Sequence, residues 1–175
     1  WPYRQIAMEV YRQMAHELGE PADETGAARF ADSIASWPPF PDTVPALRRL
    51  GSRFRLFVLS NVDEASILGS LRRLEVNFDG VFTAEQIGFY KPNPRNFDFL
   101  LAQLSARGIR PHEAVHVAHS LYHDHGPAQA AGLGTVWIDR TSSRPGAARL
   151  PCLLPPFNLR FDTLGDFAAS VLTTH

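Results

Sequence analysis

The stretch that decides the fold runs from Val115 to Arg140 and reads VHVAHSLYHDHGPAQAAGLGTVWIDR. It begins with a short apolar strand, followed by a polar turn that carries three histidines and an aspartate. An Ala/Gly-rich helix and a second apolar strand come next, so the order predicts a βαβ unit. Polar side chains then cluster just past the carboxyl end of the first strand. Ligands bind at this position in open parallel sheets, and we expect the functional site there.

The rest of the chain extends this pattern into an α/β fold. Apolar strands are predicted at residues 54–60, 80–83, 114–118, 135–138 and 158–161. Helices are predicted before, between and after them at residues 42–51, 63–74, 94–107 and 162–172, with a proline-containing loop at 141–156. Asp42 and Asp63 are expected to open two of these helices. Strands that alternate with helices indicate a mostly parallel, doubly wound sheet with right-handed crossovers.

The first 36 residues follow a different pattern. Residues 3–19 and 22–36 have helical periodicity without a strand, and a proline-dense segment from Trp37 to Asp42 follows them. Proline cannot continue a helix, so this segment predicts a hinge. We therefore expect a helical segment over residues 1–36 and an α/β domain over residues 37–175.

The composition argues against several classes of partner. Charged residues make up 20% of the 175 residues and the net charge is −1, so nothing predicts a nucleic-acid or membrane-surface partner. No apolar run approaches the roughly 18 residues that a transmembrane helix needs. The one cysteine, Cys152, excludes an intrachain disulfide framework and favours a reducing compartment. We expect a cytoplasmic protein that binds a small-molecule substrate. The mixed face of residues 1–18 leaves room for a homodimer.

Lys91 is the only lysine among 17 basic residues, the other 16 being arginines. An ammonium group is compact and titratable, whereas a guanidinium is a planar fork that stays charged. The lone lysine therefore suggests a place where arginine does not fit. The alternative is an ordinary surface residue, and the surrounding loop YKPNP, just before a predicted helix, favours the functional interpretation.

Three polar motifs lie at the tips of predicted strands or before a helix: FVLSNVD, YKPNPRNF and HVAHSLYHD. In this order, and followed by AGLGTVWIDR, they resemble the second, third and fourth motifs of the haloacid dehalogenase superfamily. The resemblance covers the chain from about Trp37 onward, and residues 1–36 are similar to the latter half of a cap. It implies a Rossmann-like parallel sheet core with a partial helical cap.

Within the superfamily the chain is most similar to the 2-haloacid dehalogenases. Family phosphatases carry Gly-Asp-Ser where this chain has Ala118-His119-Ser120, so a carboxylate that helps to hold Mg²⁺ is missing. The resemblance therefore implies a metal-independent hydrolase with no cofactor. The chain also departs from the dehalogenases, which carry a small polar residue and an asparagine where it has His119 and Leu121.

The resemblance also implies roles for individual residues. Displacement of a halide needs a carboxylate nucleophile, stabilisation of the leaving anion and a base that activates water for ester hydrolysis. The resemblance implies catalytic roles for Lys91 and Asp124, which would form an ion pair, and for Ser60, which would hydrogen-bond the nucleophile. Substrate binding falls on Asn61, His119 and Ser120. No metal ligand is assigned.

The nucleophile itself is missing from the sequence. In the family it follows the first strand, which lies in the middle of the sheet between the strands that end here at Ser60 and Ala118. None of the carboxylates before Ser60 follows an apolar strand. An absent central strand would leave buried backbone groups unpaired at about 1–3 kcal/mol each. We therefore expect a fragment that is inactive by itself, with the alternative of a chain that has dispensed with the nucleophile.

Other functions remain open at this point. The four histidines His116, His119, His123 and His125 allow a metal site, although His116 lies within a predicted strand and ligands must converge. Another reaction on a small organic acid or natural product, a family phosphatase, and a non-catalytic binding module are the further alternatives.

Overall fold

The computed structural model describes residues 1–140 and 157–173. The predicted loop at 141–156 lies outside this range. The helices are α1 (Tyr3–Glu17), α2 (Glu24–Ser33), α3 (Thr43–Gly51), α4 (Glu64–Leu74), α5 (Ala84–Ile87), α6 (Arg95–Ser105), α7 (Gly126–Ala130) and α8 (Leu164–Leu172). Short 3₁₀ turns η1 (Ile34–Ser36) and η2 (Pro111–Glu113) and a π-helix η3 (Leu121–His125) supplement them. The strands are β1 (Phe57–Ser60), β2 (Gly80–Thr83), β3 (Val115–Ala118), β4 (Gly134–Ile138) and β5 (Leu159–Phe161).

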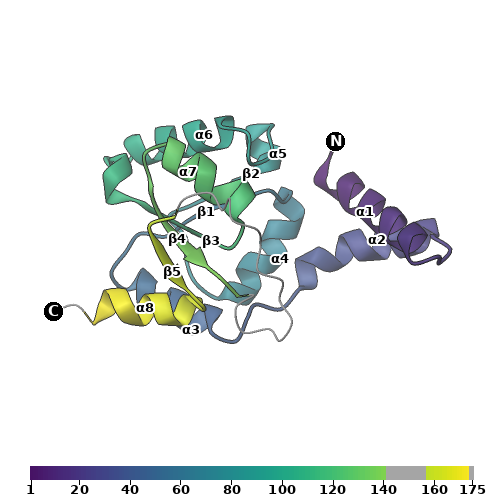
Figure 1. Ribbon diagram of the computed structural model, residues 1–175, viewed down its shortest axis with the longest axis horizontal. Helices are drawn as coiled ribbons and strands as arrows, with labels where there is room; N and C mark the ends of the chain where they lie inside the picture. Colours follow the sequence, from purple (N-terminus) through teal and green to yellow (C-terminus); the bar gives the residue numbers. More distant parts are fainter. Residues whose placement is uncertain (141–156, 174–175) are drawn as a thin grey trace.

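All strand pairs are parallel, as predicted, and they form two separate sheets. β1 pairs with β2, with Val58 opposite Val81, while β4 lies between β3 and β5, with Val117 opposite Val136. In Figure 1, α5, α6 and α7 lie on one side of the strands and α3 and α8 on the other. In the described part of the chain no ladder joins β1 to β3.

The facing edges of β1 and β3 carry backbone groups that pair with no strand among the described residues. Gly134 N donates to Ala114 O, so alternate residues of β3 turn their backbone to β4, while Val115 and Val117 turn theirs the other way. Asp79 N likewise donates to Leu56 O, which leaves the backbone of Leu59 turned away from β2. The resemblance put the absent central strand between these two edges, and the observed topology agrees.

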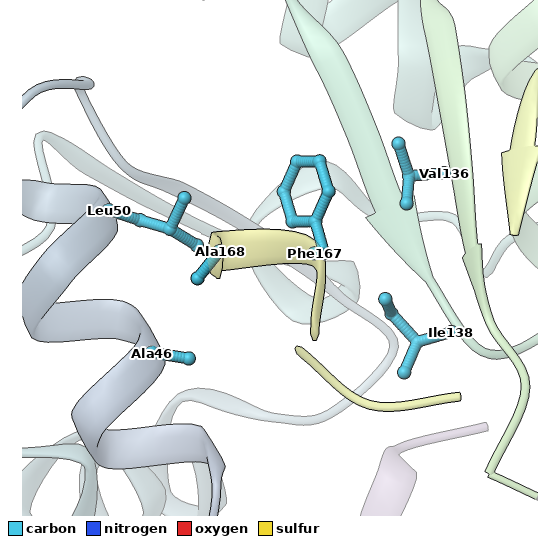
Figure 2. Packing of buried hydrophobic residues seen from close by; sticks show 6 residues of the cluster. All are labelled: Ala46, Leu50, Val136, Ile138, Phe167 and Ala168. Atoms are coloured by element: carbon cyan, nitrogen blue, oxygen red, sulfur yellow. The ribbon is translucent and has the colours of Figure 1, made fainter. Parts of the chain in front are cut away.

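Two apolar clusters hold the helices against the strands. Figure 2 shows the first, in which α3, β4 and α8 meet through Ala46, Leu50, Val136, Ile138, Phe167 and Ala168. The second joins β2, α6 and α7 through Phe82, Phe97, Leu100, Leu104, Ala128 and Leu133. Because the clusters lie on opposite faces, strand β4 is buried almost throughout, as expected for a strand covered on both sides.

The N-terminal helices form a hairpin with a small core of its own. α1 and α2 pack through Ala7, Ala31 and Ile34, and in Figure 1 the hairpin projects from the α/β body. It reaches that body where η1 meets α4. A Cβ atom added at Gly69 would overlap the carbonyl oxygen of Ala35, so this contact depends on a glycine. The predicted division at residues 36 and 37 stays a prediction.

Several element boundaries differ from the sequence prediction for local reasons. The first strand begins at Phe57 rather than 54 because Arg53 N and Phe54 N both bond back to Leu50 O and keep the chain in a turn. Asp63 caps α4 as expected by accepting from Ser66 N at 2.6 Å.

Asp42 precedes α3, but its carboxylate serves another helix. It accepts from the amides of Leu164 and Gly165 at the start of α8 and pairs with Arg140 at 2.9 Å. Asp42 therefore ties three distant segments together instead of capping its own helix. None of the described helices combines the length and the apolar character needed to cross a bilayer.

Candidate active site

The site begins at the loop between α5 and α6, where Lys91 is fixed by its backbone. Asn61, the residue after β1, accepts from Lys91 N through Oδ1 at 2.7 Å and donates from Nδ2 to Lys91 O at 3.1 Å. The Lys91–Pro92 peptide bond is cis. Two reciprocal hydrogen bonds leave this backbone little freedom to rotate, so Asn61 sets the direction from which the lysine side chain enters the site.

The ammonium group of Lys91 joins β1 to the turn after β3. Its Nζ donates to Leu59 O at 3.0 Å and to Asp124 Oδ1 at 2.5 Å. The Lys91 and Asp124 side chains are only 10% and 9% exposed. Leu59 O belongs to the edge of β1 that faces away from β2, so the ammonium lies at the facing edges of the two sheets. An ammonium has three N–H donors, and these contacts use two.

Asp124 is held in η3 by the polar residues around it. Ser120 begins this turn: its hydroxyl accepts from His123 N at 3.2 Å, and its carbonyl accepts from Asp124 N at 3.1 Å. His116, on β3, places Nε2 at 2.9 Å from Asp124 Oδ1. Burial by itself would raise the pKa of Asp124, but the hydrogen bond from His116 and the charge of Lys91 outweigh it and lower that pKa. Asp124 is therefore a carboxylate at neutral pH.

The structure brings some of the predicted site residues together and gives others structural partners. Lys91, Asn61 and Asp124 meet as described. Ser60 ends β1 beside Leu59, and its hydroxyl has no hydrogen-bond partner among the described residues. The Asn61 side-chain amide is hydrogen-bonded to the Lys91 backbone. The Ser120 hydroxyl also contacts His123 Nδ1 at 2.9 Å. The predicted roles of Ser60 in catalysis and of Asn61 and Ser120 in substrate binding stay predictions.

His119 is exposed at the carboxyl end of β3. Its Nδ1 donates to Ile138 O at 2.8 Å, and its carbonyl accepts from Trp137 Nε1 at 3.0 Å. Because a carbonyl can only accept, the hydrogen on Nδ1 is assigned, and Nε2 is the ring nitrogen that can meet a ligand. Its predicted contact with a substrate carboxylate stays a prediction.

His116 is the site residue that the sequence interpretation missed. In the sequence it is one of four histidines that allow a metal site, and it has no part in the predicted catalytic group. The alternation along β3 was the available signal, since a polar residue between Val115 and Val117 must face the side opposite to theirs. His125 is also fully buried, with Nε2 bonded to Ala118 O, and burial lowers its pKa. Within residues 1–140 and 157–173, no group of three His, Cys, Asp or Glu side chains has a metal-binding arrangement.

The chain resembles known proteins in sequence and in fold. Residues 4–132 match the family model of haloacid dehalogenase-like hydrolases. The chain is 34% identical over 104 residues to a glyceraldehyde 3-phosphate phosphatase of Methanothermobacter thermautotrophicus, covering 58% of this chain and 45% of that protein. It is 32% identical over 115 residues to (S)-2-haloacid dehalogenase 1 of Pseudomonas sp., covering 64% and 49%. The chain thus spans about half the length of the curated relatives it matches.

Solved structures agree on the fold. The L-2-haloacid dehalogenase of Xanthobacter autotrophicus, solved with chloropropionic acid covalently bound, superposes with a TM-score of 0.75. That alignment has 19% sequence identity and covers 100% of this chain and 78% of the other. At this identity the likeness concerns the fold alone.

Proposed function

Because the chain belongs to the haloacid dehalogenase-like hydrolase family, we propose that it is the larger part of a metal-independent dehalogenase acting on a small 2-haloacid. The observation that carries the proposal is the buried pair of Lys91 and Asp124 at the facing edges of β1 and β3. A dehalogenase relative from Pseudomonas sp. matches 64% of the chain, which supports the same reaction.

The proposed reaction has two displacement steps. A carboxylate oxygen of an aspartate attacks the carbon that bears the halogen, and the halide leaves with the bonding electron pair. Water then attacks the carbonyl carbon of the resulting ester, gives up a proton, and releases the hydroxy acid and the aspartate. We assign the attacking aspartate to a strand that pairs between β1 and β3, because both edges there offer backbone groups that no strand of the described chain pairs with.

Lys91 suits this reaction because it brings one charge and several donors to the edge where the aspartate would lie. The third N–H of its ammonium remains for the attacking carboxylate or the substrate carboxylate. Asp124 keeps the ammonium in place and lies close enough to the same region to accept a proton from water. A guanidinium is larger and planar, so arginine at this position would lose the contact with Leu59 O or displace the nucleophile.

A phosphatase is the second candidate, favoured by the 34% identity to a glyceraldehyde 3-phosphate phosphatase. The side chains at the site distinguish the two reactions. His119 stands where family phosphatases carry an aspartate for Mg²⁺, and its Nδ1 is bonded to Ile138 O. The replacement of a metal-binding carboxylate by an imidazole favours the dehalogenase.

The test is halide release from 2-chloropropionate by the complete natural protein, with and without EDTA. We expect turnover that EDTA leaves unchanged, and loss of at least 100-fold in Lys91→Arg despite the retained charge. Arg72→Lys, an exposed change on α4, serves as the matched control and should keep wild-type activity. Mg²⁺-dependent phosphate release from an aryl phosphate, without halide release, would establish the phosphatase instead.

A further inference from the structure

His116 is a polar residue in the middle of an otherwise apolar strand. Its side chain is 12% exposed, and its ring packs edge-on against Phe97 of α6, with ring centroids 5.2 Å apart. Val117, the next residue, instead packs against the cluster on the opposite face of the sheet. A buried imidazole is costly unless it is hydrogen-bonded, so the partner of His116 reveals what keeps it there.

That partner is the carboxylate oxygen that also binds Lys91. His116 Nε2 lies 2.9 Å and Lys91 Nζ 2.5 Å from the same atom, Asp124 Oδ1. An ionised carboxylate only accepts hydrogen bonds, so Nε2 of His116 must carry a hydrogen and donate. The imidazole and the ammonium come from β3 and from the loop before α6, so the two donors reach Asp124 from different elements.

Two donors on one oxygen fix the carboxylate more firmly than one. With Lys91 alone, the Asp124 side chain could rotate while keeping a single contact, and the ammonium would move with it. We propose that His116 is a positioning residue that acts through Asp124 to hold the Lys91 ammonium against β1. The inference rests on the proposed function for its catalytic meaning, but the positioning itself can be measured without any activity.

The sole lysine makes Lys91 a site-specific probe. Protein labelled with ¹⁵N at lysine side chains gives one Nζ signal. His116→Leu keeps an apolar side chain beside Phe97 but removes the donor, whereas His116→Gln can place an amide N–H near the position of Nε2. We expect the Nζ signal to shift and its hydrogens to exchange several-fold faster in the leucine variant, and to stay near wild type in the glutamine variant.

His112→Leu is the matched control, because His112 is exposed in η2 and takes no part in the site. It should leave the Nζ signal unchanged. An unchanged Nζ signal in folded His116→Leu would overturn the proposal. If that variant does not fold, the wild-type ring decides: ¹⁵N spectra must show hydrogen on Nε2 of His116, and a bare Nε2 would also overturn it.

Activity of the complete protein gives the second arm. His116 acts through Asp124 and Lys91 and does not touch the substrate, so His116→Leu should lower kcat roughly 10-fold or more while KM changes little. His116→Gln should recover most of the rate. Wild-type kcat in a folded leucine variant contradicts the positioning role. If the wild-type protein releases no halide, the proposed function is contradicted instead. The shift of the Nζ signal in His116→Leu would then still support the positioning role.

Discussion

At the scale of single residues, Asp124 carries the electrostatics of the site. Its side chain is 9% exposed yet ionised, because His116 and Lys91 both point hydrogens at one of its oxygens. Breaking such a pair by removing one partner costs about 3–5 kcal/mol, since the remaining charge stays buried. Replacing either partner alone is therefore destabilising. The pair also makes the free energy of unfolding depend on pH.

The lowered pKa of Asp124 fixes the sign of that dependence. The unfolded chain binds a proton near the ordinary aspartate value of 3.8, and the folded chain binds it only at lower pH. The contribution of Asp124 is therefore fully present above this value and is lost as pH falls through it toward the folded pKa. We expect Asp124→Asn to flatten the fall of unfolding free energy between about pH 5 and pH 3, by up to about 1.4 kcal/mol per pH unit.

Urea unfolding at half-unit pH intervals measures this slope. Asp98→Asn is the control for the removal of a carboxyl group, because Asp98 is exposed on α6. An unaltered slope in Asp124→Asn would mean that Asp124 titrates alike in the folded and unfolded chains.

Some of this residue-level arrangement could be predicted from the sequence, and the reason for the rest is physical. The pairing of Lys91 with Asp124 could be predicted because Lys91 is the only lysine and because the order of the three motifs resembles that of the haloacid dehalogenase superfamily. The Asn61–Lys91 backbone contact joins residues 30 positions apart, and no local pattern encodes it. His116 could have been placed on its strand face by alternation, but its partner depends on how η3 turns after the strand.

At the scale of elements, the junction between the N-terminal hairpin and the α/β body depends on Gly69. This glycine lies inside α4, where alanine would ordinarily stabilise a helix by about 1 kcal/mol. An added Cβ would overlap Ala35 O and lie 2.7 Å from Ala35 Cβ in η1. The helix and the turn must therefore separate, and the loss of packing outweighs the gain in helix propensity.

We expect Gly69→Ala to lower the free energy of unfolding by roughly 1–3 kcal/mol, the range typical of overpacking. Limited proteolysis should cut the Trp37–Asp42 segment faster in the variant. Gly165→Ala is the matched control, because a Cβ there meets Asp42 Cβ at an ordinary 3.5 Å. If Gly69→Ala is more stable than wild type, η1 can move away from the added Cβ without a loss of packing energy.

The secondary structure itself was largely predictable, because helical spacing and apolar strands leave clear patterns. The exceptions were places where tertiary contacts override local preference. Asp42 stands at the N-cap position of α3 as predicted, but its carboxylate accepts from the amides of Leu164 and Gly165 and does not cap its own helix. A π-helix at Leu121–His125 stands where a polar turn is predicted, and it buries Asp124 and His125.

At the scale of the whole molecule, the two sheets are linked at the site by side chains instead of a strand ladder. Lys91 bonds to Leu59 O on one sheet, and its carboxylate partner is held by His116 on the other. Behind this contact, Leu59 and Val117 turn backbone groups toward each other's sheet, and no strand of residues 1–140 or 157–173 lies between them. Such edges bind a further strand readily, so a strand added between β1 and β3 would join the two sheets.

Amide hydrogen exchange tests this arrangement directly. In the 175-residue chain, the amides of Leu59 and Val117 should exchange at least 100-fold faster than that of Val136 in β4, which is paired on both sides, a difference of about 3 kcal/mol. In a longer protein that supplies the proposed central strand, both amides should become as protected as Val136, because that strand would accept their hydrogens. Val136 should change little and is the internal control. Equal protection of all three in the 175-residue chain would contradict the open edges, and continued fast exchange in the complete protein would place the nucleophile outside this gap.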